Sequence, residues 1–391
     1  RTLMAQELYK NLNGLRICVA GAGVTGLAVA RSLTKRGVEV TLIDENKIST
    51  DEFPVVHPDA ITITDFDRLL ISPGWKESHP VIQAARAAQV PLINEVDYAW
   101  SVKKPAQKWI SLTGTNGKTT VTSLLEYFWN GSGISAGVIG TLGARYYAEG
   151  KLVLLPTART TPESCELQAE LALMRDAGVK AVAMEVSSHA LSLHRVDGIH
   201  FKLALFTNLS QDHLDFHHTM DEYFLAKSKL FTSNFSECAL INIDDSYGKR
   251  LFANCDISSV SISTSVGDWQ LSLSDLQLTS PSGKHHIFDS PLVGDFNQMN
   301  AAMALVAFTQ TGGNMEEGIE LLRRFPGVPG RLEQVGTGSP LVLVDYAHTP
   351  DAVTRVLASL RSYTHGRIIA VLGCGGDRDS LKRPEMGRAL Q

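Results

Sequence analysis

The 391-residue sequence lacks the features of a secreted, membrane-spanning or general nucleic-acid-binding protein. Its five cysteines are scattered, odd in number and never spaced as a metal-binding pair, which favours unbridged thiols in a reducing compartment. No hydrophobic run approaches the roughly 18 residues that a membrane span needs, and no signal peptide is visible. The net charge of −5 does not indicate a nucleic-acid-binding surface.

An alternation of strand and helix patterns fills the first part of the chain. Apolar runs at 15–21, 38–44 and 68–74 predict strands, and the periodicity of 24–37 predicts a helix that ends at Gly37. Strands that alternate with helices are typical of a parallel sheet. The sequence therefore predicts an α/β fold here.

Two further α/β blocks follow this first part. A polar, proline-bearing linker at 101–108 precedes a block that begins at Trp109. We expect three domains, at 1–103, 104–336 and 337–391. The last of them has only about two expected strands, at 341–347 and 367–373, too few for an independently stable α/β domain. We therefore expect it to be incomplete.

The stretch "TGTNGKTT" at 113–120 has the features of a phosphate-binding loop between a strand and a helix. Gly114 and Gly117 let the backbone approach phosphate oxygens, Lys118 can neutralise the β- and γ-phosphates, and Thr119 can reach Mg²⁺. The spacing departs from the usual G-x-x-x-x-G-K-[ST] because position 112 is Leu. A glycine-rich turn without a ligand is the alternative, and the strand and helix on either side disfavour it.

A second glycine loop, "GAGVTG" at 21–26, follows the first predicted strand, and Asp44 ends the next one. This combination is normally interpreted as a dinucleotide fingerprint. By itself the pattern is weak, and it leaves the ligand open.

Acidic and histidine side chains follow two apolar strands of the central block. Glu185 closes one strand, and Asp212, His213 and Asp215 come just after another. A charge at the end of a buried strand is costly unless it is paired or bound to a cation, which favours a metal site. The alternative is helix capping, for which Ser187 and Asp212 are suitable.

Further polar residues lie close by. His217 and His218 are expected to face solvent. The amphipathic helix predicted at 222–231 carries Lys227 and Lys229, and we expect Lys229 to be solvated.

The motifs "GTNGKTT", "EVSSHAL", "TNLSQDHLDFH" and "YFLAKSKLF" occur in an order that resembles the ATP-dependent Mur ligases of peptidoglycan precursor synthesis. The resemblance continues through "GDFNQMNAAMAL", "VPGRLE", "VDYAHTPDA" and "GCGGDRD". Residues 109–391 resemble the ligase that adds the third amino acid (MurE-like). Residues 14–100 resemble the UDP-binding domain of the D-glutamate-adding ligase (MurD-like). The chain could be a natural hybrid, an engineered chimera or a reconstructed ancestor.

The resemblance implies a Rossmann-like N-terminal domain, a P-loop central domain with a parallel sheet, and the start of a third, Rossmann-like α/β domain. It implies ATP contacts by Gly114, Thr115, Asn116, Gly117, Lys118, Thr119, Thr120, Asn297, Asn300, Arg331, Asp345 and His348. It implies UDP-substrate contacts by Val24, Thr25, Asp44, Ser72, Pro73, Gly74, Thr160, Thr161, Ser187 and Arg195. Arg378 matches a contact to the incoming amino acid.

The implied catalytic residues are Lys118, Glu185, His213 and Lys227. Two Mg²⁺ ions are expected, with Thr119 at the first and Glu185, His213 and Lys227 at the second. Lys227 matches the lysine that carries a CO₂-derived carbamate, which offers oxygen ligands where a protonated lysine would repel the cation.

The implied activity is an ADP-forming amide ligation through an acyl phosphate. The enzyme would add diaminopimelate or L-lysine to UDP-MurNAc-L-Ala-D-Glu. Its partners would be the UDP-MurNAc-peptide and a free amino acid, and it would act as a cytoplasmic monomer. The family's D-N-P-R-type motif, which helps to choose the incoming amino acid, is absent from this sequence.

Three other functions stay open at this point. The first is D-glutamate addition to UDP-MurNAc-L-Ala, favoured by the first hundred residues. The second is a non-catalytic UDP-sugar-binding scaffold. The third is a nicotinamide-dependent oxidoreductase that uses residues 21–26, which would leave "TGTNGKTT" unexplained.

Overall fold

The chain folds into two compact units. One comprises residues 1–107, 162–178 and 193–199, and the other comprises 108–161, 179–192 and 200–391. The computed structural model describes residues 12–46, 48, 50–71, 75, 78–94, 98, 108–148, 150–157, 159–336, 340–347, 350–373 and 382–390. In this part of the chain, no helix is both long enough and apolar enough to cross a bilayer.

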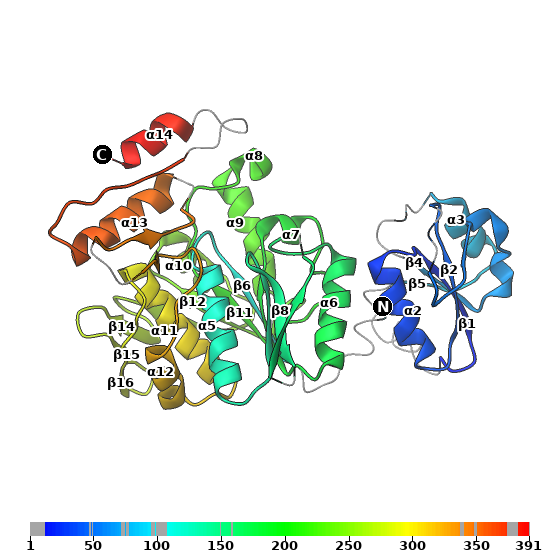
Figure 1. Cartoon of the computed structure of the whole chain (residues 1–391), viewed down its shortest axis with the longest axis horizontal. Helices are drawn as coiled ribbons and strands as arrows, with labels where there is room; N and C mark the ends of the chain where they lie inside the picture. The colour runs from blue at the N-terminus through cyan, green and yellow to red at the C-terminus, as the bar shows by residue number, and fades with distance from the viewer. Residues whose placement is uncertain are drawn as a thin grey trace. The chain divides into compact units, whose positions relative to one another are not determined.

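The first unit contains a five-stranded, all-parallel sheet in the order β3-β2-β1-β4-β5 (Figure 1). Its strands are β1 (Arg16–Ala20), β2 (Glu39–Ile43), β3 (Val55–Val56), β4 (Arg68–Ile71) and β5 (Leu92–Asn94). Its helices are α2 (Val24–Thr34), α3 (Pro80–Ala87) and α6 (Ser164–Asp176), with single turns η1 (Pro58–Ala60) and η2 (Ile63–Asp65).

Strand β1 explains why this part of the sequence is so apolar. Ile17 and Val19 are buried in one hydrophobic cluster, and Cys18 and Ala20 are buried in another. A strand covered on both faces has a continuous apolar run instead of an alternating one. The predicted parallel α/β fold is confirmed for this unit.

The second unit is built on an eleven-stranded sheet in the order β16-β15-β14-β13-β12-β11-β6-β10-β7-β8-β9. The pairs from β14 to β7 are parallel, and the two ends of the sheet are antiparallel. The strands are β6 (Lys108–Thr113), β7 (Ala136–Gly140), β8 (Gly143–Ala148), β9 (Lys151–Leu155), β10 (Ala181–Glu185), β11 (Leu203–Phe206), β12 (Cys238–Asn242), β13 (Ser258–Ser263), β14 (Trp269–Ser272), β15 (Gln277–Thr279) and β16 (His285–Ile287).

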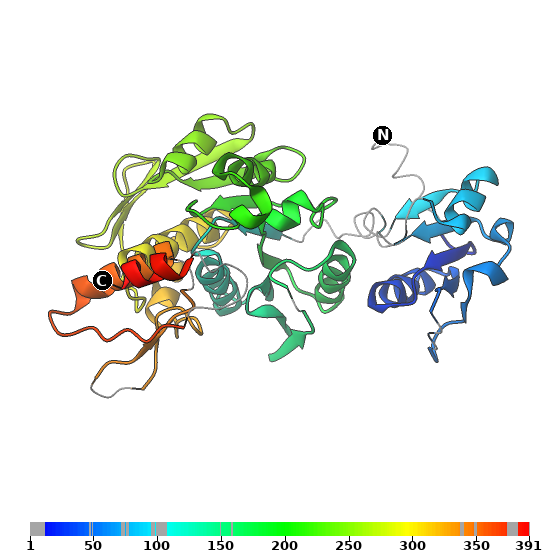
Figure 2. The same cartoon turned by 90° about the horizontal axis from the view of Figure 1, so that it is seen from above.

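Helices cover both faces of this sheet (Figures 1 and 2). They are α5 (Lys118–Gly131), α7 (Ser188–Ser192), α8 (Leu214–His217), α9 (Met220–Ser228), η3 (Lys229–Phe231), α10 (Ser246–Ala253), α11 (Asp295–Gln310) and α12 (Met315–Arg323). On one face, Phe128 of α5 packs against Phe308 of α11, with ring centroids 5.6 Å apart. On the other, Phe206 of β11 meets Phe231, with ring centroids 6.1 Å apart.

The C-terminal part contains less strand than the sequence predicts. It contains β17 (Glu333–Gln334), β18 (Leu343–Val344), α13 (Pro350–Tyr363) and α14 (Lys382–Ala389). The strand predicted at 341–347 is reduced to β18, and the prediction of a strand at 367–373 is wrong for this structure. No strand pairs with 367–373 among the described residues, and Ile369 and Val371 are 71% and 96% exposed.

The order of the central strands positions the site. Strand β6 lies between β11 and β10, and all three are parallel. Phe206 of β11 is level with Thr113 of β6, and Glu185 of β10 is level with Leu112. The segments that follow these strands therefore leave the same edge of the sheet, where ligands bind in open α/β folds.

Candidate active site

Glycines shape the loop between β6 and α5. Gly114 and Gly117 have φ angles of 148° and 87°. A Cβ on Gly114 would lie 1.9 Å from Oγ1 of Thr207, and one on Gly117 would lie 2.3 Å from Oδ1 of Asn300. Only glycine fits at these two positions, because both the backbone angle and the close neighbours exclude a side chain.

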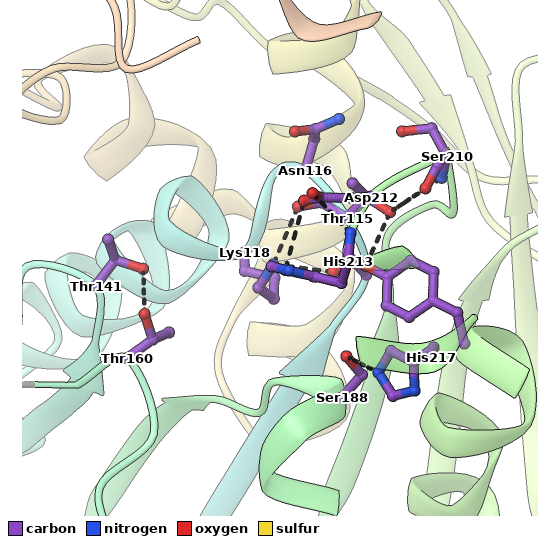
Figure 3. A network of polar contacts seen from close by, with 12 residues as sticks. Thr115, Asn116, Lys118, Thr141, Thr160, Ser188, Ser210, Asp212, His213 and His217 are labelled. Atoms are coloured by element: carbon purple, nitrogen blue, oxygen red, sulfur yellow. Dashed lines mark hydrogen bonds and ion pairs between the residues drawn. The ribbon is translucent and has the colours of Figure 1, made fainter. Parts of the chain in front are cut away.

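Lys118 begins helix α5 and folds back over this loop. Its Nζ donates to the carbonyl oxygens of Gly114 at 2.9 Å and Thr115 at 3.1 Å (Figure 3). Burial lowers the pKa of Lys118, and the negative charges of Glu185 and Asp212 oppose that shift. The amine therefore hydrogen-bonds to neutral carbonyl oxygens, and two carboxylates lie near enough to act on its charge. A phosphate could take the place of these carbonyls as the hydrogen-bond acceptor.

Residues from the far end of the chain reach the start of α5. Nη2 of Arg331 donates to Oγ1 of Thr119 at 3.2 Å, and its guanidinium carbon lies 5.2 Å from the ring centroid of Tyr346. Both oxygens of Asp345 accept backbone N–H groups, those of Leu332 and Ala347, at 2.8 Å. Asp345 therefore joins two backbone segments next to Arg331.

Helix α11 contributes two buried amides beside the loop. Asn300 is 5% exposed and its Nδ2 donates to Oδ1 of Asn297 at 3.2 Å. Asn297 is 2% exposed and its Nδ2 donates to the carbonyl oxygen of Val293 at 2.8 Å. Both amides lie in the first turns of a helix, and Asn300 contacts the loop at Gly117.

Glu185 ends β10 and is only 1% exposed. Its Oε1 accepts the N–H of Thr141 at 2.9 Å, and its Oε2 accepts the hydroxyl of Thr141 at 3.0 Å. A Cβ on Gly140 would lie 2.3 Å from Oε1, so this glycine makes room for the carboxylate. The carboxylate is thus held at the sheet edge by a residue that the sequence analysis did not identify.

Thr160, Thr161 and Ser187 lie close to Glu185. The hydroxyls of Thr160 and Thr141 are 3.2 Å apart (Figure 3). Oγ1 of Thr161 donates to the carbonyl oxygen of Glu185 at 2.9 Å and accepts the N–H of Ser187 at 3.1 Å. Oγ of Ser187 accepts the N–H of Ala190 at 3.1 Å, which agrees with the capping role predicted for Ser187.

The segment after β11 carries Asp212 and His213. Oδ1 of Asp212 accepts the N–H of His213 at 2.9 Å, and its Oδ2 lies 3.4 Å from Nε2 of His213. Burial lowers the pKa of His213, Asp212 opposes this shift, and the charges of Lys227 and Lys118 add to it. The side chain of Asp215, also a metal candidate, lies outside the described residues.

Lys227 of α9 points toward the phosphate loop. It is 1% exposed, and its Nζ donates to the carbonyl oxygen of Gly114 at 2.9 Å and to Oγ1 of Thr113 at 3.3 Å. Burial lowers the pKa of Lys227 well below its usual value, and the nearby charge of Lys118 adds to this. Lys229 is exposed, as expected.

The prediction for His217 is wrong. It is 5% exposed, and its Nε2 lies 2.8 Å from Oγ of Ser188 (Figure 3). Its ring stacks on Tyr223 at a centroid distance of 5.2 Å. The single turn of α8 packs against both α7 and α9, and these two helices bury the His217 side chain. The local sequence, which is polar here, does not reveal this. His218 is exposed, as expected.

The first unit shows the second glycine loop after β1. Asp44 follows β2, and its Oδ2 accepts the N–H of Ala22 in this loop at 2.9 Å. A Cβ on Gly26 would lie 1.7 Å from the carbonyl oxygen of Gly21, so helix α2 can approach the loop only with glycine there. Val24 and Thr25 begin α2, and their side chains lie outside the described residues.

Arg195 has an acidic partner within the first unit. Its Nη2 lies 2.9 Å from Oε1 of Glu163. Arg195 can therefore hold a carboxylate, and here that carboxylate belongs to the same chain. Five predicted site residues lie outside the described part of the chain: Ser72, Pro73, Gly74, His348 and Arg378.

Three family models match the chain in order. The "Mur ligase MurD-like, N-terminal domain" matches residues 15–94, the "Mur ligase middle domain" matches 112–308, and the "Mur ligase, glutamate ligase domain" matches 330–391. The middle-domain model alone includes half of the chain. The chain belongs to the Mur ligase family. The predicted family is thereby confirmed, and so is the MurD-like character of the N-terminal part.

Curated Mur ligases resemble the chain over most of its length. A "UDP-N-acetylmuramoyl-L-alanyl-D-glutamate--2,6-diaminopimelate ligase" of Streptomyces coelicolor is 44% identical over 292 residues, which are 72% of this chain and 57% of that protein. A ligase of the same name from Xanthomonas campestris is 37% identical over 383 residues, which are 95% of this chain and 72% of that protein. The chain thus spans little more than half of the length of the Streptomyces relative.

Solved Mur ligase structures share the fold. A structure of a "UDP-N-acetylmuramoyl-L-alanyl-D-glutamate--2, 6-diaminopimelate ligase" is 28% identical, with a TM-score of 0.59 over 97% of this chain and 74% of that one. A pseudomurein peptide ligase type C from Methanothermus fervidus, 19% identical with a TM-score of 0.54, shows the same fold over 88% of this chain and 77% of its own. The predicted α/β architecture is confirmed.

Proposed function

We propose that the chain catalyses ATP-dependent addition of an amino acid to UDP-MurNAc-L-Ala-D-Glu, with diaminopimelate favoured over L-lysine. The names of the relatives support diaminopimelate, because the Streptomyces and Xanthomonas proteins are both diaminopimelate ligases. The observation that carries the proposal is the shared sheet edge. There the glycine loop and Lys118, the carboxylate of Glu185 and the buried amine of Lys227 come together.

The reaction joins a carboxylate to an amine. An oxygen of the acceptor carboxylate attacks the γ-phosphorus of ATP, the bond to ADP breaks, and an acyl phosphate forms. The amine then attacks the acyl carbon, loses a proton, and expels phosphate with the bonding electrons. Lys118 donates to the phosphate oxygens in place of the loop carbonyls, and the N-terminal end of α5 adds its positive potential.

Mg²⁺, when bound, supplies the positive charge that lets two anions approach each other. The hydroxyl of Thr119 and the carboxylate of Glu185 suit this ion, since Mg²⁺ favours oxygen ligands. Thr119 would hold the first ion, and Glu185 and His213 the second. Among the described residues, no group of three or more His, Cys, Asp or Glu side chains could hold a metal. An oxygen ligand from a further residue would complete the set around the second ion.

Lys227 can provide that ligand as a carbamate. Burial lowers the pKa of its amine, and the unprotonated form is the one that attacks the carbon of CO₂, with loss of a proton, to give an anion with oxygen donors. Its position between Thr113 and Gly114 places it beside the loop that would hold the phosphates. The carbamate would also place an anion next to Lys118, which lowers the electrostatic cost of burying the charged form of Lys118.

The proposed function also assigns a role to each domain. The chain would consist of a UDP-binding part at 1–103, an ATP-binding part at 104–336 and an amino-acid-binding part at 337–391. It would act as a monomer in the cytoplasm, where ATP and UDP-linked precursors are present. Asp44, which accepts the Ala22 N–H of the second glycine loop, would face the UDP moiety.

The test is phosphate release with two acceptors and three amino acids. UDP-MurNAc-L-Ala-D-Glu and UDP-MurNAc-L-Ala are each combined with D-glutamate, L-lysine and meso-diaminopimelate. We expect release with UDP-MurNAc-L-Ala-D-Glu and diaminopimelate. Release with only UDP-MurNAc-L-Ala and D-glutamate would instead support the second candidate, which the MurD-like match at 15–94 favours. ATP-independent binding of a UDP-sugar without any turnover would support a scaffold.

A further inference from the structure

The carboxamide of Asn208, just after β11, makes two hydrogen bonds to the backbone of Asn116 in the phosphate loop. Oδ1 of Asn208 accepts the N–H of Asn116 at 3.0 Å, and its Nδ2 donates to the C=O of Asn116 at 3.1 Å. Oγ1 of Thr207 donates to the same carbonyl at 2.6 Å. The backbone carbonyl of Asn208 also accepts the N–H of Thr115 at 2.8 Å. Hydrogen bonds thus hold the phosphate loop against the segment that follows β11.

These bonds fix the direction of the next peptide group. The C=O of Asn116 and the N–H of Gly117 belong to one planar, trans peptide, so they point in opposite directions. Because Asn208 and Thr207 hold the carbonyl on their side, the N–H of Gly117 is directed away from them. Gly117 is the N-cap of α5, and within the described part of the chain no side-chain hydrogen bond caps that helix end. Its N–H therefore belongs to the set of donors that can bind an anion.

The same bonds decide which loop donors remain for a ligand. The N–H groups of Thr115 and Asn116 are both used by Asn208. In contrast, Nδ2 of Asn116 is buried and has no hydrogen-bond partner among the described residues. A buried donor without a partner is costly, which indicates that a ligand completes this site.

We propose that Asn208 is a positioning residue that aims the Gly117 N–H at the phosphates of ATP. The inference rests on the proposed function, because it takes ATP as the anion. Asn208 itself does not touch the reacting atoms. It sets nucleotide affinity by holding the loop in its binding geometry before ATP arrives, which removes an ordering cost from binding.

Asn130, at the other end of α5, provides a matched control. Its Oδ1 accepts the N–H of Ala136 at 3.1 Å, and its Nδ2 donates to the carbonyl oxygen of Glu126 at 2.9 Å. Asn130→Ala therefore removes the same types of bond as Asn208→Ala, at a distance from the phosphate loop. If Asn208 has a merely structural role, the two variants should have the same ADP affinity.

The experiment is calorimetric titration of the 391-residue chain with ADP and Mg²⁺, together with thermal melting. We expect Asn208→Ala to bind ADP at least about tenfold more weakly and Asn130→Ala to bind it within about twofold of wild type. Both should lower the melting temperature by similar amounts. The isosteric Asn208→Asp keeps the acceptor but loses the donor, so it should also bind weakly, and it carries the test if Asn208→Ala does not fold.

Two results overturn different claims. If wild type binds ADP and both Asn208 variants bind it equally well, Asn208 does not position the loop and the inference is rejected. If wild type itself does not bind ADP, the proposed function fails, and the inference fails with it.

Discussion

Lys118 and Lys227 donate hydrogen bonds to the same carbonyl oxygen, that of Gly114, each at 2.9 Å. Two protonated amines so close together repel each other, and burial increases the cost. Lys118 is partly exposed and has two carboxylates near it, whereas Lys227 is 1% exposed, and burial lowers the pKa of both amines. Burial therefore disfavours the charged form of Lys227 in particular, because two carboxylates oppose the pKa shift at Lys118 and only Asp212 opposes it at Lys227.

This difference in surroundings suits the two lysines to different chemistry. A cation on a glycine loop is suited to phosphate oxygens, and a neutral, buried amine is suited to react with CO₂. Both roles depend on Gly114, because its carbonyl orients both amines and its missing side chain leaves room for Thr207. The proposed phosphate site and the proposed carbamate are thus parts of one structure at the end of β6.

Replacement of Lys118 tests the first of these roles. Lys118→Ala should reduce acceptor-dependent phosphate release at least about a hundredfold, because it removes a charged donor to the transferring phosphoryl group. Lys229→Ala is the control, since Lys229 is an exposed lysine nearby. It should leave phosphate release within about twofold of wild type. Near-normal release by Lys118→Ala would contradict the assignment.

A pair of glycine substitutions tests the shape of the loop. Gly117 and Gly133 lie at the two ends of α5 and have φ angles of 87° and 74°. Alanine at either position is strained by roughly 1–2 kcal/mol, but only at position 117 would the new Cβ clash, 2.3 Å from Oδ1 of Asn300. Gly117→Ala should weaken ADP binding at least about tenfold, as measured by calorimetry. Gly133→Ala should lower the free energy of unfolding, as measured by urea unfolding, and leave ADP affinity unchanged. Equal ADP affinity in both variants would count against this loop as the phosphate site.

Local sequence patterns predicted the parts of the site that depend on one segment. The glycines and the lysine of the phosphate loop lie next to each other in the sequence, between a strand and a helix that their periodicity reveals. Glu185 was found because a charge ends an apolar strand. In each case the physical reason acts within about ten residues of the chain, so a single sequence contains it.

Other parts of the site depend on which strands become neighbours. Thr141 holds Glu185 only because β7 pairs with β10, and Asn208 holds Asn116 only because β11 pairs with β6. Strand order follows from packing across the whole sheet, and apolar periodicity does not reveal it. The only available signal was a polar residue directly after an apolar strand. The prediction for His217 was wrong for a related reason. Its burial comes from contacts with α7 and α9, which are not evident from the sequence of its own turn.

The carbamate on Lys227 has a direct chemical test. Lys227→Ala should lose at least about a hundredfold in phosphate release, and short carboxylic acids such as formate or acetate should restore part of it by occupying the space of the carbamate. In wild type, ¹³C-labelled bicarbonate should give a carbamate carbon signal that is missing from Lys227→Ala. Lys229→Ala should retain the signal. Full activity of Lys227→Ala at saturating Mg²⁺ would exclude the role.

The lowered pKa of Lys227 also predicts a dependence of stability on pH. The unfolded chain binds this proton up to the ordinary lysine pKa of 10.5, whereas the folded chain releases it at lower pH. Between the lowered pKa and 10.5 the unfolded state binds more protons, so the free energy of unfolding rises with pH, by up to about 1.4 kcal/mol per pH unit from one group. Lys227→Met removes this contribution. In CO₂-free buffer, urea unfolding from neutral pH to pH 10 should show wild type gaining stability relative to Lys227→Met as pH rises, and a constant difference would mean that Lys227 is protonated in the folded protein.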